Sequence, residues 1–164
     1  MTIKFDGNPL NLVGEQVKVG DVAPDFTATN NDLKDVYFKD TKGVRVILTV
    51  PSIDTPVCDL ETRTFNSKAT SIPNVSIYTI SMDLPFAQSR WCAAHGIKNV
   101  TTLSDYKDRL VGSNYGTYIK ELGLLTRAAF VVDSTNKIVY VEYLDEITEQ
   151  PNYNAILKAA SEAK

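Results

Sequence analysis

Residues 46–58, VILTVPSIDTPVC, join an apolar run to a segment of helical character that begins near Asp59. The run Val46–Val50 lacks polar alternation, which is typical of a strand buried on both faces. Cys58 therefore falls in the first turn of the expected helix. Unpaired backbone N–H groups and the positive end of the helix dipole favour a thiolate over a thiol at that position. Cys58 is thus a candidate nucleophile, and the alternative is a buried structural cysteine, the more common fate of this residue type.

The loop before Cys58 is stiff and carries a hydroxyl group. Pro51 and Pro56 fix two backbone dihedrals, and each favours an extended conformation for the residue before it. Thr55 lies three positions before Cys58, so we expect its hydroxyl to face the sulfur and to donate or accept hydrogen bonds there. These neighbours favour a reactive cysteine over a structural one.

Three residues of this loop, Pro51, Thr55 and Cys58, match the pattern P-x-x-x-T-x-x-C of the peroxiredoxins. The longer strings PSIDTPVC and DLPFAQSRWC resemble the thiol peroxidase branch of that family, and APDF at residues 23–26 is shared widely among peroxiredoxins. The resemblance extends from IKFDGNPL near the start of the chain to LDEITEQPNY near its end. It implies a cysteine peroxidase that uses no metal, flavin or haem.

The composition predicts one domain, and its charge argues against two classes of partner. A chain of 164 residues can bury a sizeable core, and we expect one domain over residues 1–164. The net charge of −3 gives no broad basic field, so we expect neither nucleic acid nor an anionic membrane as a partner. The first residues lack a charged segment followed by an apolar core, so we expect no signal peptide, and no later apolar run approaches membrane-spanning length. With two cysteines, we expect a soluble, cytoplasmic protein with reduced or cycling thiols, although the resemblance leaves a periplasmic location open.

The order of expected elements is that of an α/β, thioredoxin-like fold, with a mixed central sheet flanked by helices. An N-terminal β-hairpin extension, within about residues 1–15, is expected to turn at Asp6-Gly7. Residues 99–126 are expected to form an insertion. The other elements follow in the order β-α-β-α-β-β-α, and we expect them at residues 45–50, 58–69, 75–80, 85–95, 128–132, 138–143 and 153–160.

The second cysteine, Cys92, lies in the helix expected at residues 85–95. Cys58 and Cys92 are 34 positions apart on different expected helices, which excludes the C-x-x-C arrangement of thioredoxin itself. The resemblance to atypical 2-Cys peroxiredoxins implies that Cys58 is the peroxidatic thiol and Cys92 the resolving thiol, joined in an intramolecular disulfide. The alternative is that Cys92 is a small core residue packed beside Trp91.

The chain offers too few partner residues for two other kinds of cysteine site, a zinc site and a Cys–His protease dyad. Cys92 and His95 are three positions apart and could share one helix face, as two metal ligands would. A closed zinc site takes four ligands, whereas the chain offers two cysteines and one histidine. A Cys–His protease dyad would need that same histidine and an orienting partner at Cys58. We expect no metal and no cofactor, and we interpret His95 as a helix-end residue favoured by the dipole.

Arg127 immediately precedes the strand expected at 128–132, and the string TRAAFVVD matches the family with its active-site arginine at this position. A thiolate needs a partner cation that does not lose its proton, and arginine meets that requirement. The resemblance implies that Arg127 holds the Cys58 thiolate and orients the peroxide. The alternative is a surface arginine at a strand end. Arg63 also matches the family, and we expect it to act from further away.

These features together predict a thiol-dependent peroxidase for hydrogen peroxide and organic hydroperoxides. Cys58 would attack the peroxide, and Thr55 and Arg127 would stabilise the departing oxygen. Pro51 would shield the site from water. Cys92 would then resolve the sulfenic acid formed at Cys58. The resemblance implies thioredoxin as reductant and a homodimer. Two alternatives stay open: a peroxide sensor that passes its disulfide to a partner protein, and a thioredoxin-like binding module without catalysis.

Overall fold

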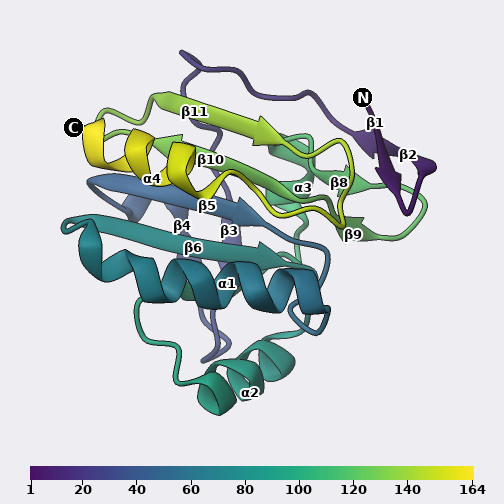
Figure 1. Cartoon of the computed structure of the whole chain (residues 1–164), viewed down its shortest axis with the longest axis horizontal. Coiled ribbons are helices and arrows are strands. Elements are labelled where there is room, and N and C mark those ends of the chain that lie inside the picture. The colour runs from purple at the N-terminus through teal and green to yellow at the C-terminus, as the bar shows by residue number, and fades with distance from the viewer.

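The computed structural model describes residues 1–164 and contains a large mixed sheet, a small sheet and four α-helices (Figure 1). In spatial order the strands of the large sheet are β11 (Ile138–Tyr143), β10 (Ala128–Val132), β5 (Val44–Thr49), β6 (Val75–Ser81), β7 (Thr101–Ser104), β3 (Thr27–Thr29) and β4 (Asp35–Tyr37). The small sheet contains β1 (Thr2–Phe5), β2 (Asn8–Val13), β8 (Tyr118–Ile119) and β9 (Leu124–Leu125). The helices are α1 (Pro56–Lys68), α2 (Pro85–His95), α3 (Leu110–Asn114) and α4 (Tyr153–Glu162), with 3-10 turns η1 (Phe38–Asp40) and η2 (Ala69–Ser71).

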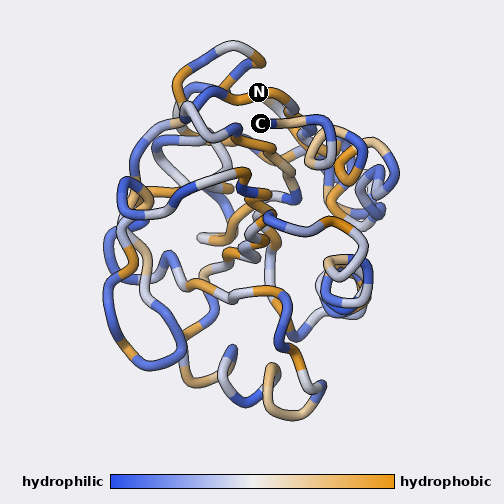
Figure 2. The backbone as a smooth tube through the Cα atoms, turned by 90° about the vertical axis from the view of Figure 1, so that its left-hand side faces the viewer, coloured by the Kyte–Doolittle hydropathy of each residue, from blue (hydrophilic) through white to orange (hydrophobic).

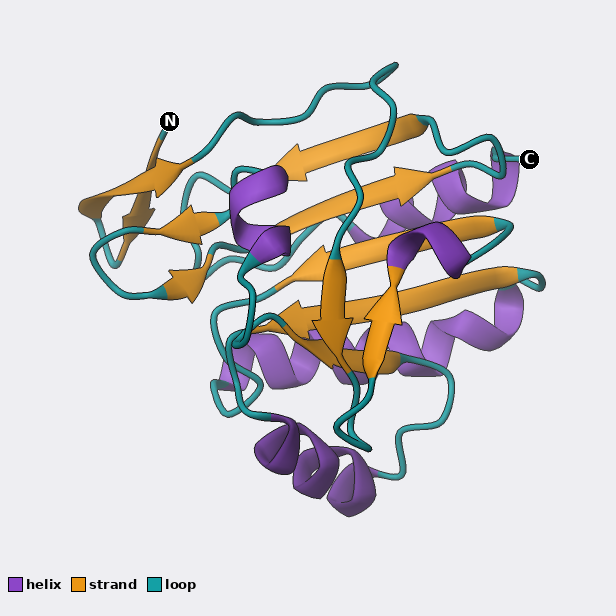
Figure 3. Cartoon of the chain, turned by 180° about the vertical axis from the view of Figure 1, so that it is seen from behind, coloured by secondary structure: helices purple, strands orange, loops and turns teal.

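The centre of the large sheet is buried on both faces, which explains the apolar runs at residues 46–48 and 128–132. Every residue of β5 and β10 is buried. Val46 and Leu48 pack on the face covered by α1 and α4, whereas Ile47 and Phe130 pack on the opposite face, on the side of α3. Figure 3 shows α1 and α4 behind the sheet and α3 in front of it. The most hydrophobic stretches of the chain run along these central strands, and hydrophilic stretches occupy many of the outer loops (Figure 2).

The mixed strand directions confirm the thioredoxin-like α/β class. Strands β5, β6 and β7 are parallel to one another, while β10 pairs antiparallel with β5 and β11 pairs antiparallel with β10. Helix α2 has the expected bounds and ends at Gly96 in the left-handed conformation, with φ 62°. Helix α1 begins at Pro56, two residues earlier than expected, because proline suits the first helical position. None of the helices is both long and apolar enough to cross a bilayer.

The N-terminal hairpin forms as predicted and turns at Asp6 and Gly7, whose φ angles of 48° and 82° suit a tight hairpin turn. Its second strand pairs with β8 through Leu12 and Ile119. The hairpin therefore belongs to the small sheet, together with strands from the segment 99–126 that we expected to be an insertion.

That segment also contributes a strand to the large sheet, so describing all of it as an insertion was wrong. β7 lies beside β6 as a parallel strand, with Tyr78 opposite Thr101 and Ser81 opposite Ser104. Its sequence, TTLS, has four residues and a single aliphatic side chain, so no apolar run marks it. Strands β3 and β4 have three residues each and were not anticipated either, because such short strands carry no detectable period.

Replacing Phe130 by alanine tests the core. The ring is fully buried and packs edge-on against Tyr115 and Tyr143, with ring centroids 5.1 and 5.4 Å away. We expect Phe130→Ala to lower the free energy of unfolding by about 3–5 kcal/mol, measured by urea denaturation. Val139→Ala, at an exposed position of β11, is the control and should cost less than about 1 kcal/mol. Equal costs for the two variants would contradict this description of the core.

Candidate active site

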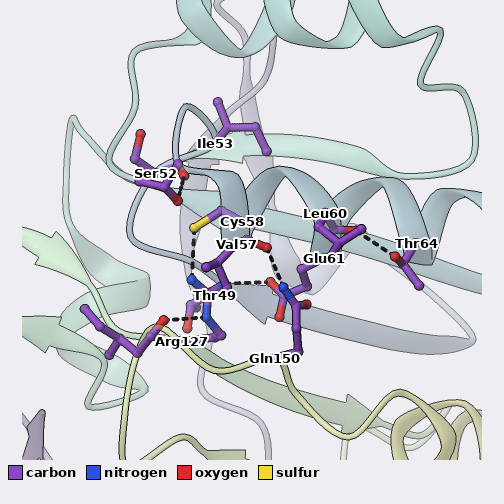
Figure 4. Close-up of polar contacts among 12 residues, drawn as sticks. Thr49, Ser52, Ile53, Val57, Cys58, Leu60, Glu61, Thr64, Arg127 and Gln150 are labelled. Atoms are coloured by element: carbon purple, nitrogen blue, oxygen red, sulfur yellow. Dashed lines mark hydrogen bonds and ion pairs between the residues drawn. The ribbon is translucent and has the colours of Figure 1, made fainter. Parts of the chain in front are cut away.

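Cys58 lies in the first turn of α1, just beyond the carboxyl end of β5 (Figure 4). Its side chain is fully buried, and both cysteines are free thiols. Thr55 precedes the helix in an extended conformation, with φ −88° and ψ 146°, as a residue before proline should. The sequence therefore located the sulfur correctly, at a helix N-terminus where backbone N–H groups favour a thiolate.

Arg127 is buried and faces this sulfur. Its Nη2 lies 3.2 Å from the Cys58 Sγ, its Nε donates to the Ile147 carbonyl oxygen at 2.8 Å, and its Nη1 lies 3.3 Å from the Glu61 Oε2 (Figure 4). The antiparallel pairing of Ala128 with Thr49 brings the start of β10 to the end of β5 and so places the guanidinium beside α1. The alternative of a surface arginine is wrong.

Glu61 is the second ionisable side chain, after Cys58, that contacts the Arg127 guanidinium. The sequence analysis did not single it out. It is fully buried, and its Oε1 has no hydrogen-bond partner. Burial raises the pKa of Glu61 to about 8, although the charge and hydrogen bond of Arg127 act in the opposite direction. One signal was available: Glu61 follows Cys58 by three positions, which puts the two side chains on the same face of α1.

Thr55 and Pro51 lie around the same turn. The Thr55 hydroxyl donates to the Ser52 carbonyl oxygen at 2.8 Å and makes no hydrogen bond to the Cys58 sulfur, which differs from our expectation. A hydroxyl has one proton, and here the nearby backbone carbonyl takes it. Pro51 is buried in the loop that follows β5.

Cys92 lies apart from this cluster. It is partly exposed on α2, and its Sγ lies 3.3 Å from the Thr102 Oγ1 on β7. Helix α2 is joined to α1 through Asp59, whose Oδ1 accepts from the Trp91 Nε1 at 2.7 Å. The structure thus brings Cys58 together with Arg127, while the two sulfurs have different partners on different elements.

Arg63 takes part in that junction and not in the thiol cluster. Its Nη2 lies 2.8 Å from the Asp59 Oδ2, and 46% of its side chain is exposed. Partial burial acts to raise the pKa of Asp59, but hydrogen bonds from Arg63 and Trp91 outweigh it and hold that pKa below its usual value. Arg63 therefore acts on the contact between the two cysteine-bearing helices.

Comparisons with known proteins show the family of this chain. The sequence model of the Redoxin family matches residues 18–157. The thiol peroxidase of Clostridium acetobutylicum is 63% identical over 164 residues, which is all of both chains. The chain belongs to the thiol peroxidases of the Redoxin family. The thiol peroxidase of Bacillus subtilis is 54% identical over 96% of this chain and 95% of its own. The crystal structure of a peroxiredoxin-like protein from Aquifex aeolicus, 42% identical, superposes with a TM-score of 0.93 over 98% of this chain and 96% of that one.

The thiol peroxidase loop is anchored by Asp83, a second residue that the sequence analysis did not single out. Its carboxylate accepts from the Ser52 hydroxyl at 2.7 Å, from the Ile53 N–H at 2.7 Å and from the Ser81 hydroxyl at 2.6 Å. Asp83 stands between β6 and Pro85, the first residue of α2. One carboxylate therefore joins the loop before Cys58 to the start of the helix that carries Cys92.

Replacing Asp83 by alanine should loosen the active-site loop. The change leaves the Ile53 N–H and two hydroxyls without their acceptor, which costs about 1–3 kcal/mol for each buried donor left unpaired. We expect a lower urea midpoint and faster amide exchange at Ile53. Asp83→Asn keeps one acceptor oxygen and should have an intermediate effect. Unchanged exchange at Ile53 in Asp83→Ala would show that the loop is held by other contacts.

Proposed function

We propose that this thiol peroxidase reduces hydroperoxides with Cys58 as the peroxidatic thiol, Cys92 as the resolving thiol and a thioredoxin-type dithiol as the reductant. The observation that carries the proposal is the 3.2 Å contact between the Arg127 guanidinium and the buried Cys58 sulfur. A fixed positive charge in a buried site stabilises both the thiolate and the negative charge that develops on the departing oxygen.

In the first step the Cys58 thiolate attacks the terminal oxygen of the hydroperoxide. The S–O bond forms as the O–O bond breaks, and the departing oxygen takes the hydroperoxide proton to leave as water or an alcohol. The products are a sulfenic acid at Cys58, ionised or neutral according to pH, and the reduced substrate. Because the Thr55 hydroxyl proton is used at Ser52, the Thr55 oxygen keeps its lone pairs and can accept the O–H of the hydroperoxide. The buried Pro51 keeps water from the sulfur.

In the second step Cys92 attacks the Cys58 sulfenic sulfur, and the disulfide forms with loss of water. The two sulfurs contact Arg127 and Thr102 respectively, and a disulfide needs Cα atoms within about 7 Å. We infer that the first turn of α1, or α2, or both must open, which would break the Asp59–Trp91 contact.

In the third step a thioredoxin-type dithiol reduces this disulfide by thiol–disulfide exchange and leaves both cysteines reduced. Cys58 is fully buried in the reduced fold, whereas Cys92 is partly exposed. The same opening therefore makes the disulfide accessible to a protein reductant. We also propose a cytoplasmic location, where a reducing compartment maintains such dithiols.

We further propose that the enzyme works as a homodimer, as the resemblance to its family implies. Leu84 and Phe86, at the start of α2, are exposed by 52% and 67%. Large apolar side chains exposed to solvent are the kind of surface that a second subunit covers.

Arginine variants test which cation assists the first step. Arg127→Ala should slow oxidation of Cys58 by hydrogen peroxide by about 100-fold or more, because it removes charge stabilisation made in the transition state. Arg63→Ala should cost less than about tenfold, because Arg63 contacts Asp59 and not the sulfur. Quenched-flow mass spectrometry of Cys58 measures both rates, and Arg127→Lys separates charge from the bidentate geometry of arginine. A reversed ranking would mean that the wrong arginine has been assigned.

A serine at position 92 tests the resolving step. Cys92→Ser should consume about one equivalent of hydrogen peroxide per chain, because Cys58 is still oxidised, and then stop in a thioredoxin-coupled assay. In the wild-type enzyme, oxidation should raise amide exchange at residues 55–62 and 86–96 while β6 and β10 stay protected. Full thioredoxin-linked turnover of Cys92→Ser would remove the resolving role. Slow turnover of the wild type with thioredoxin would favour a peroxide sensor instead.

A further inference from the structure

Two side chains of α1 that can lose a proton, those of Cys58 and Glu61, contact the Arg127 guanidinium. The Cys58 Sγ lies 3.2 Å from the Arg127 Nη2, and the Glu61 Oε2 lies 3.3 Å from its Nη1. All three side chains are buried, so solvent cannot screen their charges. Arg127 carries one positive charge and can balance only one of the two acids. The protonation states of Glu61 and Cys58 are therefore coupled.

The groups around Glu61 leave it no other cation. Besides Cys58 on its own helix and Arg127, which immediately precedes β10, it faces the carboxylate of Glu142 from β11 and the phenol of Tyr153 from α4. Glu142 is itself an acid, and its carboxylate accepts a hydrogen bond from the Tyr140 hydroxyl at 3.0 Å. A negative Glu61 would thus compete directly with the thiolate for Arg127.

We propose that Glu61 is a positioning residue that keeps its proton during peroxide reduction, so that the charge of Arg127 is directed to the Cys58 thiolate. Loss of that proton turns the guanidinium toward Glu61 and slows the attack on peroxide. The proposal rests on the proposed role of Cys58 as the peroxidatic thiol. It assigns to Glu61 no contact with the substrate, since Glu61 acts only through Arg127.

The environment of the carboxyl group supports a neutral Glu61. Its Oε1 is buried without a hydrogen-bond partner, and an ionised oxygen in that position would carry the full cost of desolvation. Burial raises the pKa of Glu61 to about 8, against the opposing charge of Arg127 and with a smaller contribution from Glu142 in the same direction as burial. Glu61 is then neutral at neutral pH and becomes charged over the alkaline range.

The pH dependence of Cys58 oxidation tests the proposal. In the Cys92→Ser background, which isolates the first step, the rate with hydrogen peroxide should fall about tenfold between about pH 7 and about pH 9.5, with a midpoint near the pKa of Glu61. Glu61→Gln keeps an amide oxygen for Arg127 but carries no titrating proton, so its rate should change less than about twofold over that range.

Two further variants make the test specific. Glu162→Gln, at an exposed position near the end of α4, removes the same charge far from the site and should keep the fall. Glu142→Gln removes a negative charge that raises the pKa of Glu61, so it should move the midpoint of the fall to lower pH. A protonated carboxyl band in the infrared spectrum, lost as pH rises from about 7 to about 9.5 and missing from Glu61→Gln, should follow the same midpoint.

The outcomes separate this inference from the proposed function. If Glu61→Gln shows the same fall as the wild type, or only a uniform loss of rate at every pH, the inference is wrong while Cys58 keeps its role. If Cys58 in the wild type is not oxidised by hydrogen peroxide, the proposed function fails. The infrared titration of the wild type then still decides whether Glu61 holds its proton, and a carboxyl already ionised at pH 7 overturns the inference even if Glu61→Gln does not fold.

Discussion

The buried positive charge of Arg127 is the constraint on which the rest of the site depends. A guanidinium removed from water costs several kcal/mol unless its N–H groups and its charge find partners. Here the partners are the Ile147 carbonyl oxygen, the Glu61 carboxyl group and the Cys58 sulfur. They come from the segment after β11 and from α1, while Arg127 itself immediately precedes β10. One charge therefore ties three elements together and holds the first turn of α1 against the end of the sheet.

In the mechanism that we propose, the contacts that hold the site closed favour the first step and oppose the second. A closed site with a fixed cation favours attack on peroxide, because the charge needs no reorganisation during the reaction. Disulfide formation requires that a sulfur leave its pocket, so the Asp59–Trp91 contact and the Asp83 contacts to the loop resist it. The stability of the first turn of α1 thus sets a balance between a fast first step and an accessible second one. Asp83 lies at the point where both cysteine-bearing segments are anchored.

The sequence analysis predicted the helices and strands that have a clear local signal and missed the strands that lack one. Helix α2 was predicted to the residue because Pro85 and Gly96 mark its ends, and β10 because five apolar residues follow one another. Strand β7 forms because the edge of β6 offers unpaired backbone groups, and β3 pairs in turn with the outer edge of β7. Their own residues, TAT and TTLS, would not form strands alone. The hairpin was predicted from its Asp-Gly turn, but its pairing with β8 depends on chain more than 100 positions away.

The linear pattern was enough to predict the kind of chemistry, because it shows a cysteine at a helix start, after a loop stiffened by two prolines, in an α/β chain that resembles thiol peroxidases. The tertiary structure alone decided which groups share the buried charge. Glu61 and Arg127 are 66 positions apart, and Cys58 and Arg127 are 69 apart, so only the antiparallel pairing of β10 with β5 brings them into contact. It also decided that the Thr55 hydroxyl donates to Ser52 and that Asp83 anchors the loop. Hydrogen bonds and buried charges act over a few ångströms of space, and a linear pattern does not record which distant residues a sheet brings within that range.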